Sequence, residues 1–418
     1  MSKNRQIIQA AMVVDGKGAR AAPGALLLEG NEIIACGSPE SIGPVADAKI
    51  LNLGDAVVMP ALVNVHCHLD LSHIGPIDYC GDFVSWIEQI RQKRCQNDAD
   101  IASATKRGIE LSLAGGTALV GDIAGVSSLV PFTELAGSKL AGVSYVEFFG
   151  SGKNEKNTVE KLQRIDKASP KAKNGIRLGL QPHAPYSCSI GVFEAAAQTN
   201  RPIATHLAET LEELEFLADA KGPISEMLKK FGVWDEEIVA QSCYPIEYLK
   251  SVLEKHSIVA AHLNYVDNSQ IQMMKDWPIS VAYCPRASAY FGHPHNGMPV
   301  HQYQQMIEQG INVALGTDGL LCLDTPDRIS VLDEMRFLYK RDGADPVQLL
   351  NMATCAGAKA LGFDETLVTL EPGPTAGLIA ISSDIHNCDD PLVGILKSIA
   401  APQWIAGPFV IEELSSGE

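Results

Sequence analysis

The stretch VVMPALVNVHCHLDLSHIGP, residues 57–76, places His66 and His68 on either side of Cys67 in a largely apolar run. Side chains at positions i and i+2 of a β-strand point to the same face, so both imidazoles face one way and Cys67 points into the surrounding packing. Two imidazoles held this close together suit a divalent metal ion. The segment therefore predicts a buried strand that presents metal ligands.

Further apolar, β-rich runs follow this one through the middle of the chain. In chain order the eight runs are VNVHCHLDL, TALVGDIAG, VSYVEFFG, IRLGLQPHA, PIATHLAE, SIVAAHLNYV, ISVAYCPRA and INVALGTDG. Segments with helical periodicity separate them, as in residues 83–90, where apolar side chains recur at helical spacings. Strands buried on both faces and separated by helices indicate a parallel sheet. Eight such units predict an α/β fold, a closed (β/α)8 TIM-like barrel.

Polar side chains stand at or near the carboxyl ends of these predicted strands, where barrel enzymes keep their chemistry. They are His66, His68, His183, His206, His262 and Asp318. His206 ends the fifth strand and Asp318 the eighth. With the pair on the first strand they offer three nitrogens and one carboxylate oxygen, which suits zinc or a similar divalent ion with room left for water.

Both ends of the chain have a different pattern. Glycine and proline punctuate short apolar runs there, as in GALLLEGNEIIACG and TAGLIAIS, which is typical of β-hairpins. The whole chain has 418 residues, of which 46% are hydrophobic. This is enough for one large domain and a smaller one.

Composition excludes several classes of partner. The formal net charge of −17 argues against binding to nucleic acid or to an anionic membrane surface, because both need clustered lysine and arginine. The ten cysteines stand singly, which favours a reducing compartment. No apolar stretch reaches the roughly 18 residues that a membrane helix needs. We expect a cytoplasmic protein that acts on a small molecule, with a homo-oligomer left open.

With these ligands in place, the sequence resembles the amidohydrolase superfamily of metal-dependent barrel hydrolases over nearly its whole length. The run MPALVNVHCHLDL is similar to the family's first-strand signature, with Ala61 where glycine is usual. The run LEPGPTAGLIAIS is similar to its closing segment, with Gly377 where aspartate is common. The resemblance implies a small β-sandwich built from both chain ends. We expect residues 1–58 and 366–418 to form this domain and residues 59–365 the hydrolase barrel.

The resemblance also implies a single metal ion. Binuclear members bridge two metals through a carboxylated lysine at the end of the third or fourth strand, and neither VSYVEFFG nor LGLQPHAPYS contains lysine. We expect one divalent ion, Zn2+ or alternatively Fe2+, bound by His66, His68, His206 and Asp318.

Glu209, three residues after His206 in HLAET, resembles the glutamate that moves protons in the deaminase branch of this superfamily. A divalent cation lowers the pKa of bound water from about 16 toward 7. The ring nitrogen and the departing amine must both gain protons before ammonia leaves. We expect Glu209 to make these transfers while His262 and Asp318 orient or deprotonate the water. The segments QPHAPYS and YCPRAS resemble members that act on adenosine-derived nucleosides, such as thioether nucleosides or aminodeoxyfutalosine.

Four other residues are expected to contact the substrate. His183 ends the fourth strand, which supplies no metal ligand in the pattern that the sequence resembles. Trp86 and Glu88 follow the first strand, and Arg286 follows the seventh. Each of these three residues has a structural alternative: Trp86 as part of a helix core, Glu88 as a solvated side chain and Arg286 as the cap of a loop. His262 likewise could be a core histidine whose hydrogen bonds are satisfied.

Two further groups receive a structural interpretation. His293 and His295 flank Pro294 beside glycine, which indicates a loop rather than a second metal pair. The acidic run ETLEELEF is interpreted as a solvated helix face after Glu209.

Two other classes of function stay open. The same scaffold could release chloride or an alkylamine from a triazine, or open a cyclic amide. It could also serve as a non-catalytic scaffold for interaction. The five residues His66, His68, His206, Glu209 and Asp318 speak against a scaffold, which has no need of them all. Glu209 favours deamination over amide opening and leaves triazine hydrolysis open.

Overall fold

The computed structural model describes residues 5–125, 128–295, 300–383 and 388–409. Eight parallel strands form its central sheet, and they coincide with the eight predicted runs. In spatial order they are β8 (Leu62–Cys67), β9 (Thr117–Ala124), β10 (Ala141–Phe148), β12 (Ile176–Pro182), β13 (Ile203–Leu207), β14 (Ile258–His262), β15 (Ile279–Tyr283) and β16 (Asn312–Leu315). Short β11 (Ala172–Lys173) pairs with β12 in antiparallel fashion. The predicted barrel is confirmed.

The first and last strands of the barrel meet just beyond β16. The backbone N–H groups of Thr317 and Asp318 both donate to the carbonyl oxygen of His66 in β8, each at 3.0 Å. A Cβ atom added to Gly316 would lie 2.8 Å from Cβ of His66. Only glycine allows the two strands to approach this closely, so this residue helps to bring Asp318 beside the histidines of β8.

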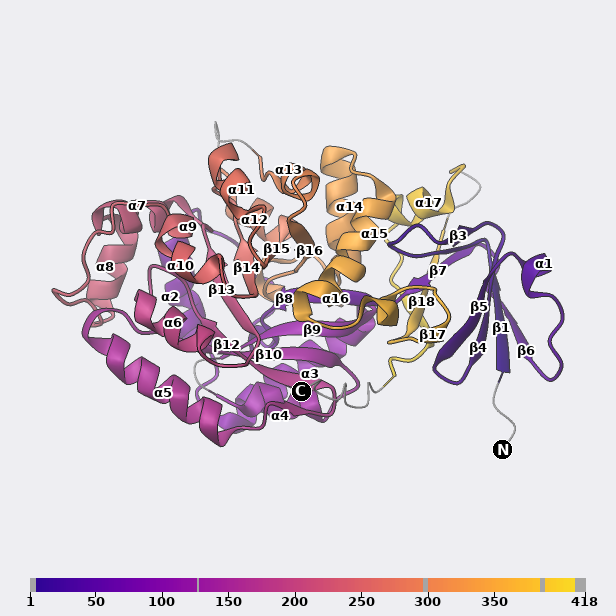
Figure 1. The fold of residues 1–418 in the computed structure, drawn as a ribbon, viewed down its shortest axis with the longest axis horizontal. Coiled ribbons are helices and arrows are strands. Elements are labelled where there is room, and N and C mark those ends of the chain that lie inside the picture. Colours follow the sequence, from indigo (N-terminus) through magenta and orange to yellow (C-terminus); the bar gives the residue numbers. More distant parts are fainter. Residues whose placement is uncertain (1–4, 126–127, 296–299, 384–387, 410–418) are drawn as a thin grey trace.

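Helices surround the barrel and cover its outer face (Figure 1). They are α2 (Phe83–Lys93), α3 (Asp98–Ala114), α4 (Val130–Ala136), α5 (Glu155–Ala168), α6 (Ile190–Ala197), α7 (Leu211–Asp219), α8 (Gly222–Lys230), α9 (Pro245–Tyr248), α10 (Lys250–Leu253), α11 (Asn268–Met274), α12 (Pro285–Phe291), α13 (Tyr303–Glu308), α14 (Val331–Asp342), α15 (Pro346–Met352) and α16 (Cys355–Leu361). Short 3-10 turns are η1 (Leu69–Leu71), η2 (Gly152–Asn154), η3 (Leu320–Cys322) and η4 (Glu365–Val368). Most of their apolar faces share one continuous core with the strands. The helices α2 and α12 pack in one separate apolar cluster, and α7 and α8 in another.

Two smaller sheets lie beside the barrel, and each combines strands that precede the barrel in the sequence with strands that follow it (Figure 1). One has the order β17 (Gly373–Pro374), β5 (Glu32–Gly37), β4 (Gly24–Glu29), β1 (Arg5–Ala10) and β6 (Lys49–Asn52). The other has the order β19 (Gln403–Ala406), β18 (Leu378–Ser382), β7 (Ala56–Pro60), β2 (Met12–Val14) and β3 (Arg20–Ala21). Helices α1 (Pro39–Ile42) and α17 (Pro391–Lys397) complete this part of the chain.

Apolar side chains from the two sheets form a core of their own, which includes Ile8, Leu26, Val58 and Leu378. The composite sandwich expected from both chain ends is therefore present. Its boundaries at residues 58 and 366 stay a prediction, and residues 1–4 and 410–418 lie outside the described residues.

β7 connects the sandwich directly to the barrel. β18 pairs with β7 in antiparallel register, from Leu378 opposite Pro60 to Ser382 opposite Ala56. The N–H of Ala61 then donates to the carbonyl oxygen of Gly377 at 2.8 Å, and β8 begins at the next residue. The metal-binding strand is thus anchored at its start by the later part of the chain. No helix in the described residues has the length and apolar composition to cross a membrane.

Candidate metal centre and active site

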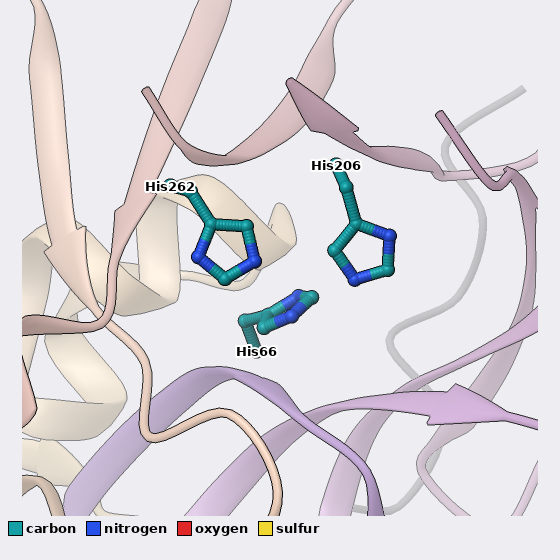
Figure 2. Close-up of side chains that lie close together, drawn as sticks. All are labelled: His66, His206 and His262. Atoms are coloured by element: carbon teal, nitrogen blue, oxygen red, sulfur yellow. The ribbon is translucent and has the colours of Figure 1, made fainter. Parts of the chain in front are cut away.

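Three buried imidazoles converge at the carboxyl end of the barrel. His66 extends from β8, His206 from β13 and His262 from β14, and Figure 2 shows their rings turned toward one shared space. One ring nitrogen from each lies within 4.8 Å of the other two. The ring centroid of His66 is 5.0 Å from that of His206 and 5.3 Å from that of His262. The sequence predicted the first two as metal ligands and the third as a catalytic group, and the geometry brings all three together.

His68 and Asp318 complete the cluster. The Nε2 atom of His68 lies 3.3 Å from Oδ1 of Asp318, and Nε2 of His66 lies 4.0 Å from the same oxygen. The ligand atoms of these three residues also lie within 4.8 Å of one another. The donor set is imidazole nitrogen plus carboxylate oxygen, which suits zinc and other divalent ions of the first transition row.

The hydrogen bonding of the cluster fits a metal ion. Neither nitrogen of His66 has a hydrogen-bond partner in the described part of the chain, and neither has Nδ1 of His68, although all three atoms are buried. Buried polar groups normally have partners. Burial, reinforced by the neighbouring imidazoles, lowers the pKa of His66 and of His68 well below the usual range. Neutral imidazoles with free lone pairs are the form that binds a metal.

Backbone carbonyl oxygens contact the imidazoles of His206 and His301. Nδ1 of His206 lies 3.1 Å from the carbonyl oxygen of His183, so the tautomer that donates there leaves Nε2 free. Nε2 of His301 lies 2.7 Å from the carbonyl oxygen of His262. His301 itself is buried, and its ring stacks on that of Tyr283 with 3.7 Å between centroids. The sequence analysis missed His301, because it lies outside the predicted strands.

Left-handed backbone conformations gather at these strand ends. φ is 49° at Ala208, 75° at His262, 51° at Leu263 and 59° at Asp318. Each such residue other than glycine costs about 1–3 kcal/mol and persists only where its surroundings enforce it. Three strand ends of the barrel thus store strain next to the imidazole cluster.

Glu209 lies beside the cluster on the loop after β13. Its Oε1 is 3.7 Å from Nε2 of His262, and its side chain is 9% exposed. Burial, reinforced by the charge of Asp318, raises the pKa of Glu209 well above its usual range. Burial also raises the pKa of Asp318, to about 6. Two carboxyl groups with raised pKa values therefore face the same small space, which suits proton transfer.

Glu213 holds the loop that carries Glu209. Its carboxylate accepts from the N–H of Ala208 at 3.2 Å and from the N–H of Glu209 at 2.9 Å. It is fully buried, whereas Glu215 on the same helix is exposed. The interpretation of the whole run ETLEELEF as a solvated face is therefore wrong for Glu213, because α7 turns this side toward the loop.

One cavity of about 790 Å³ is lined by His68, His206, Glu209, His262 and Asp318. Its apolar wall comes from α2, α8 and the segment after α8, and consists of Phe83, Trp86, Ile87, Ile90, Met227, Leu228, Phe231 and Val233. Its polar wall comes from the ends of β10 and β12 and the loops that follow, and consists of Glu147, Ser151, Asn154, Asn157, Thr158, His183 and Ser187. Asp70 and Arg94 also line it. This size and mixture are typical of a small-molecule site.

Two of the four expected substrate contacts lie in this cavity. His183 extends from the end of β12, with Nδ1 2.7 Å from Oγ of Ser187 and its ring stacked on Phe149 at 4.5 Å. Trp86 lines the apolar wall, where its Nε1–H donates to the hydroxyl of Tyr290 at 3.2 Å. Both remain proposed substrate contacts.

The other two, Glu88 and Arg286, do not reach the cavity wall. Glu88 points to the outer side of α2, where Nζ of Lys230 lies 2.6 Å from its carboxylate. Arg286 is buried in a structural network, with Nε 2.6 Å from Oε1 of Glu334 and Nη1 2.9 Å from Oδ1 of Asp324. An exposed ion pair holds Glu88 and a buried one holds Arg286, which favours the structural alternatives for both residues.

His293 lies outside the imidazole cluster, as expected. Its Nδ1 bonds to the hydroxyl of Tyr265 at 2.8 Å, and its ring centroid is 5.1 Å from that of His295. Among the polar lining groups, Glu147 and Arg94 were missed. Glu147 stands at the end of the run VSYVEFFG, so the strand-end rule could have identified it. Arg94 follows α2, and no local signal marks it.

Comparison with known proteins supports the architecture and its chemistry. The sequence profile of the Amidohydrolase family matches residues 57–411. The 5-methylthioadenosine/S-adenosylhomocysteine deaminase of Carboxydothermus hydrogenoformans is 25% identical over 376 residues, which cover 87% of this chain and 81% of that protein.

Two solved structures have the same fold. The aminofutalosine deaminase of Helicobacter pylori in complex with methylthio-coformycin has a TM-score of 0.75 at 21% identity, covering 96% of this chain and 99% of that one. The atrazine chlorohydrolase of Arthrobacter aurescens complexed with zinc has a TM-score of 0.74 at 18% identity, covering 97% and 94%.

Proposed function

Because the chain belongs to the amidohydrolase family, we propose that it is a metal-dependent deaminase that releases ammonia from an amino-heterocycle, namely an adenosine-derived nucleoside. The observation that carries the proposal is the position of Glu209. Its buried carboxylate lies beside His262 and opens into the same cavity as the imidazole cluster. A proton-transfer group therefore stands next to a site built for a divalent ion.

The family is metal-dependent, and the unpartnered nitrogens of the cluster fit such an ion. We propose that His66, His68, His206 and Asp318 hold it. Zinc is the proposed metal, with Fe2+ as the alternative, because imidazole and carboxylate ligands suit both ions and a relative of the same fold binds zinc. When bound, such an ion lowers the pKa of a water molecule toward neutrality and so supplies a nucleophile. One ring nitrogen of His262 lies within 4.8 Å of those of His66 and His206, and we propose that His262 orients that water.

Glu209 is the proposed carrier of protons. Hydrolytic deamination forms a carbon–oxygen bond and breaks a carbon–nitrogen bond, and the amine leaves readily only after protonation. The Glu209 carboxylate accepts one proton from the attacking water and passes it to the ring nitrogen, then takes the second proton from the new hydroxyl group and passes it to the leaving amine. Its raised pKa supports this double role, because a carboxyl group that holds its proton more tightly than usual can act as an acid as well as a base.

The substrate class rests on the cavity and on the relatives. The curated relative acts on 5-methylthioadenosine and S-adenosylhomocysteine, and the solved relative acts on aminofutalosine. The cavity of about 790 Å³ has room for a nucleoside. We propose that His183 and Trp86 contact it from the polar and apolar walls.

The test is a screen for ammonia release by the metal-loaded enzyme against adenosine derivatives, free purine bases, pterins, cytosine and an aminotriazine. We expect turnover with adenosine-derived nucleosides. The same panel includes a chlorotriazine, because the atrazine chlorohydrolase has the same fold. Chloride release without ammonia release from any nucleoside would favour triazine hydrolysis. Absence of turnover on the whole panel with full metal content would reject the proposal.

A further inference from the structure

Glu147 is a buried carboxylate of the cavity wall. It stands at the end of β10 with its side chain 3% exposed. Nη1 of Arg94 lies 3.7 Å from its Oε2 and Nε2 of His183 lies 3.8 Å from its Oε1, so both contacts are longer than an ordinary hydrogen bond. Arg94 therefore balances the charge of Glu147 but leaves much of its capacity to accept hydrogen bonds unused. A group in the cavity that supplies donors would be stabilised here.

Arg94 does not make this end of the cavity cationic. Its Nη2 donates to Oδ2 of Asp70 at 3.2 Å, and its Nη1 faces Glu147, so one positive charge is shared between two carboxyl groups. Nε of Arg94 and Oδ1 of Asp70 are buried without partners in the described chain. The local charge is thus balanced or negative. Arg91 also lines the cavity, but beside Glu147 the charge of Arg94 is already shared, so this place favours a neutral group that donates hydrogen bonds over an anionic one.

A second metal ion fits this place poorly. One oxygen of Glu147 and a nitrogen from each of His183 and His206 lie within 4.8 Å of one another. However, the guanidinium of Arg94 lies on the other side of the carboxylate, and Nδ1 of His206 is already directed at a backbone carbonyl. A metal ion at this place would be repelled by the positive charge of Arg94, and His206 would have only one ring nitrogen left to bind it. The arrangement favours a neutral hydrogen-bond donor.

We propose that Glu147 determines substrate specificity by accepting a pair of hydrogen bonds from the part of the substrate that lies away from the reacting carbon. The proposal rests on the function proposed above and names a recognition group for that same cavity. Two sources carry such paired donors: the vicinal hydroxyls of a nucleoside sugar, or the N–H groups of a free base. The burial of this carboxylate increases the strength of each hydrogen bond that it accepts.

The experiment compares three ligands on three proteins. The ligands are 5′-methylthioadenosine, its 2′,3′-dideoxy counterpart and adenine. The proteins are the metal-loaded wild type, Glu147→Gln and Glu160→Gln, since Glu160 is an exposed carboxylate on α5, away from the cavity wall. KM and kcat are measured from ammonia release. Kd is measured by calorimetry on the metal-free proteins, which reports binding without turnover, and thermal melting checks the fold of each variant.

If the sugar hydroxyls are the donors, removing them should weaken wild-type binding by roughly 10–100-fold, the range for hydrogen bonds to a charged group. Glu147→Gln should weaken binding of the ribonucleoside by a similar factor and add no further loss for the dideoxy ligand, because both changes remove the same contact. If a ring N–H of the free base is the source, Glu147→Gln should weaken only adenine, because the glycosidic bond removes that N–H from both nucleosides, and the wild type should bind the dideoxy ligand as it binds the ribonucleoside. Glu160→Gln should match the wild type throughout.

Equal binding of all three ligands by the wild type and by a folded Glu147→Gln would overturn the inference. If Glu147→Gln fails to fold, Glu147→Asp takes its place, because it keeps the charge but withdraws the carboxylate from the ligand. The two proposals can fail separately. Deamination by the wild type together with an unaffected Glu147→Gln rejects the recognition role alone. Nucleoside binding that depends on Glu147 without any ammonia release rejects the deaminase alone.

Discussion

His68 and Asp318 approach one another across the seam of the barrel, with Nε2 3.3 Å from Oδ1. One belongs to the segment that ends the first strand and the other follows the last strand. A neutral imidazole nitrogen and a carboxylate oxygen both present lone pairs, so either a proton or a cation must lie between them. The closure of the barrel therefore brings two of the proposed metal ligands together at this contact.

The first prediction concerns the metal content. Purified protein should contain one divalent ion per chain by elemental analysis, because the two ligand groups that contain His66 form one cluster, and the remaining group, Glu147 with His183 and His206, shares His206 with it. Asp318→Ala should lower turnover by more than ~10²-fold even where some metal persists, since a ligand is lost. His256→Ala, outside the cluster, serves as the control. Two ions per chain, both needed for activity, would contradict the mononuclear site.

A second prediction separates proton transfer from metal binding. Glu209→Gln should retain its metal and its affinity for an inhibitor, because the amide has nearly the same shape. Turnover should fall by ~10²–10⁴-fold, the usual contribution of one general acid or base. Metal content, inhibitor binding and ammonia release are measured on one preparation. Glu215→Gln, on the exposed side of α7, is the matched control. Ammonia release by Glu209→Gln at the wild-type rate would place the proton carrier elsewhere.

The third prediction concerns the pH dependence of stability. Asp122 is fully buried on β9, and burial, reinforced by Asp70, raises its pKa from 3.8 to about 8. A carboxyl group whose pKa is higher in the folded state than in the unfolded state holds its proton more tightly in the folded state. Its contribution to the free energy of unfolding is therefore fully present below pH ~4, the pKa of the unfolded chain. This contribution falls as the pH rises and is lost above about pH 8, the pKa in the folded state.

Chemical denaturation of the metal-free protein between pH 5 and 9 tests this sign. The stability of the wild type relative to Asp122→Asn should decrease steadily up to about pH 8 and then level, because the amide cannot ionise. A constant difference between the two proteins across that range would show that Asp122 does not titrate in the fold.

The fourth prediction follows from the buried ion pair of Arg286. Removing its side chain leaves the fully buried Glu334 without its partner, so Arg286→Ala should destabilise the protein by about 3–5 kcal/mol. KM of the enzyme that remains folded should stay unchanged. Glu88→Gln removes only an exposed ion pair with Lys230 and should change stability by less than ~1 kcal/mol. A large increase in KM with unchanged stability for either variant would restore a role in substrate contact.

The barrel and the imidazole cluster could be predicted because their signals are local. Alternation along one strand fixes the common direction of His66 and His68, and the carboxyl ends of parallel strands meet at one face of a barrel. These two rules are sufficient to bring His206, His262 and Asp318 near them. No knowledge of long-range packing is required.

The positions of other residues depend on partners far away in the sequence. Arg286 is held by Glu334, and nothing around residue 286 indicates that pairing. Glu88 lies on α2 next to Trp86, and only the position of α8 decides which side chain of that helix faces the cavity. Arg94 joins the cavity wall through Asp70 and Glu147. The local sequence pattern identifies a helix or strand, whereas tertiary packing decides which of its side chains face the cavity.

The pairing of β7 with β18 has a consequence for how the molecule is made. A ribosome releases β7 and the histidines of β8 long before it releases β18, and until then one edge of β7 has no partner. The nascent sandwich sheet therefore carries an open edge throughout most of the synthesis of the chain, and contacts this distant along the chain form slowly. The hydrogen bond from Ala61 to Gly377, at the start of β8, likewise forms only after the strands of the barrel have been synthesised. The waiting edge of β7 needs protection until then.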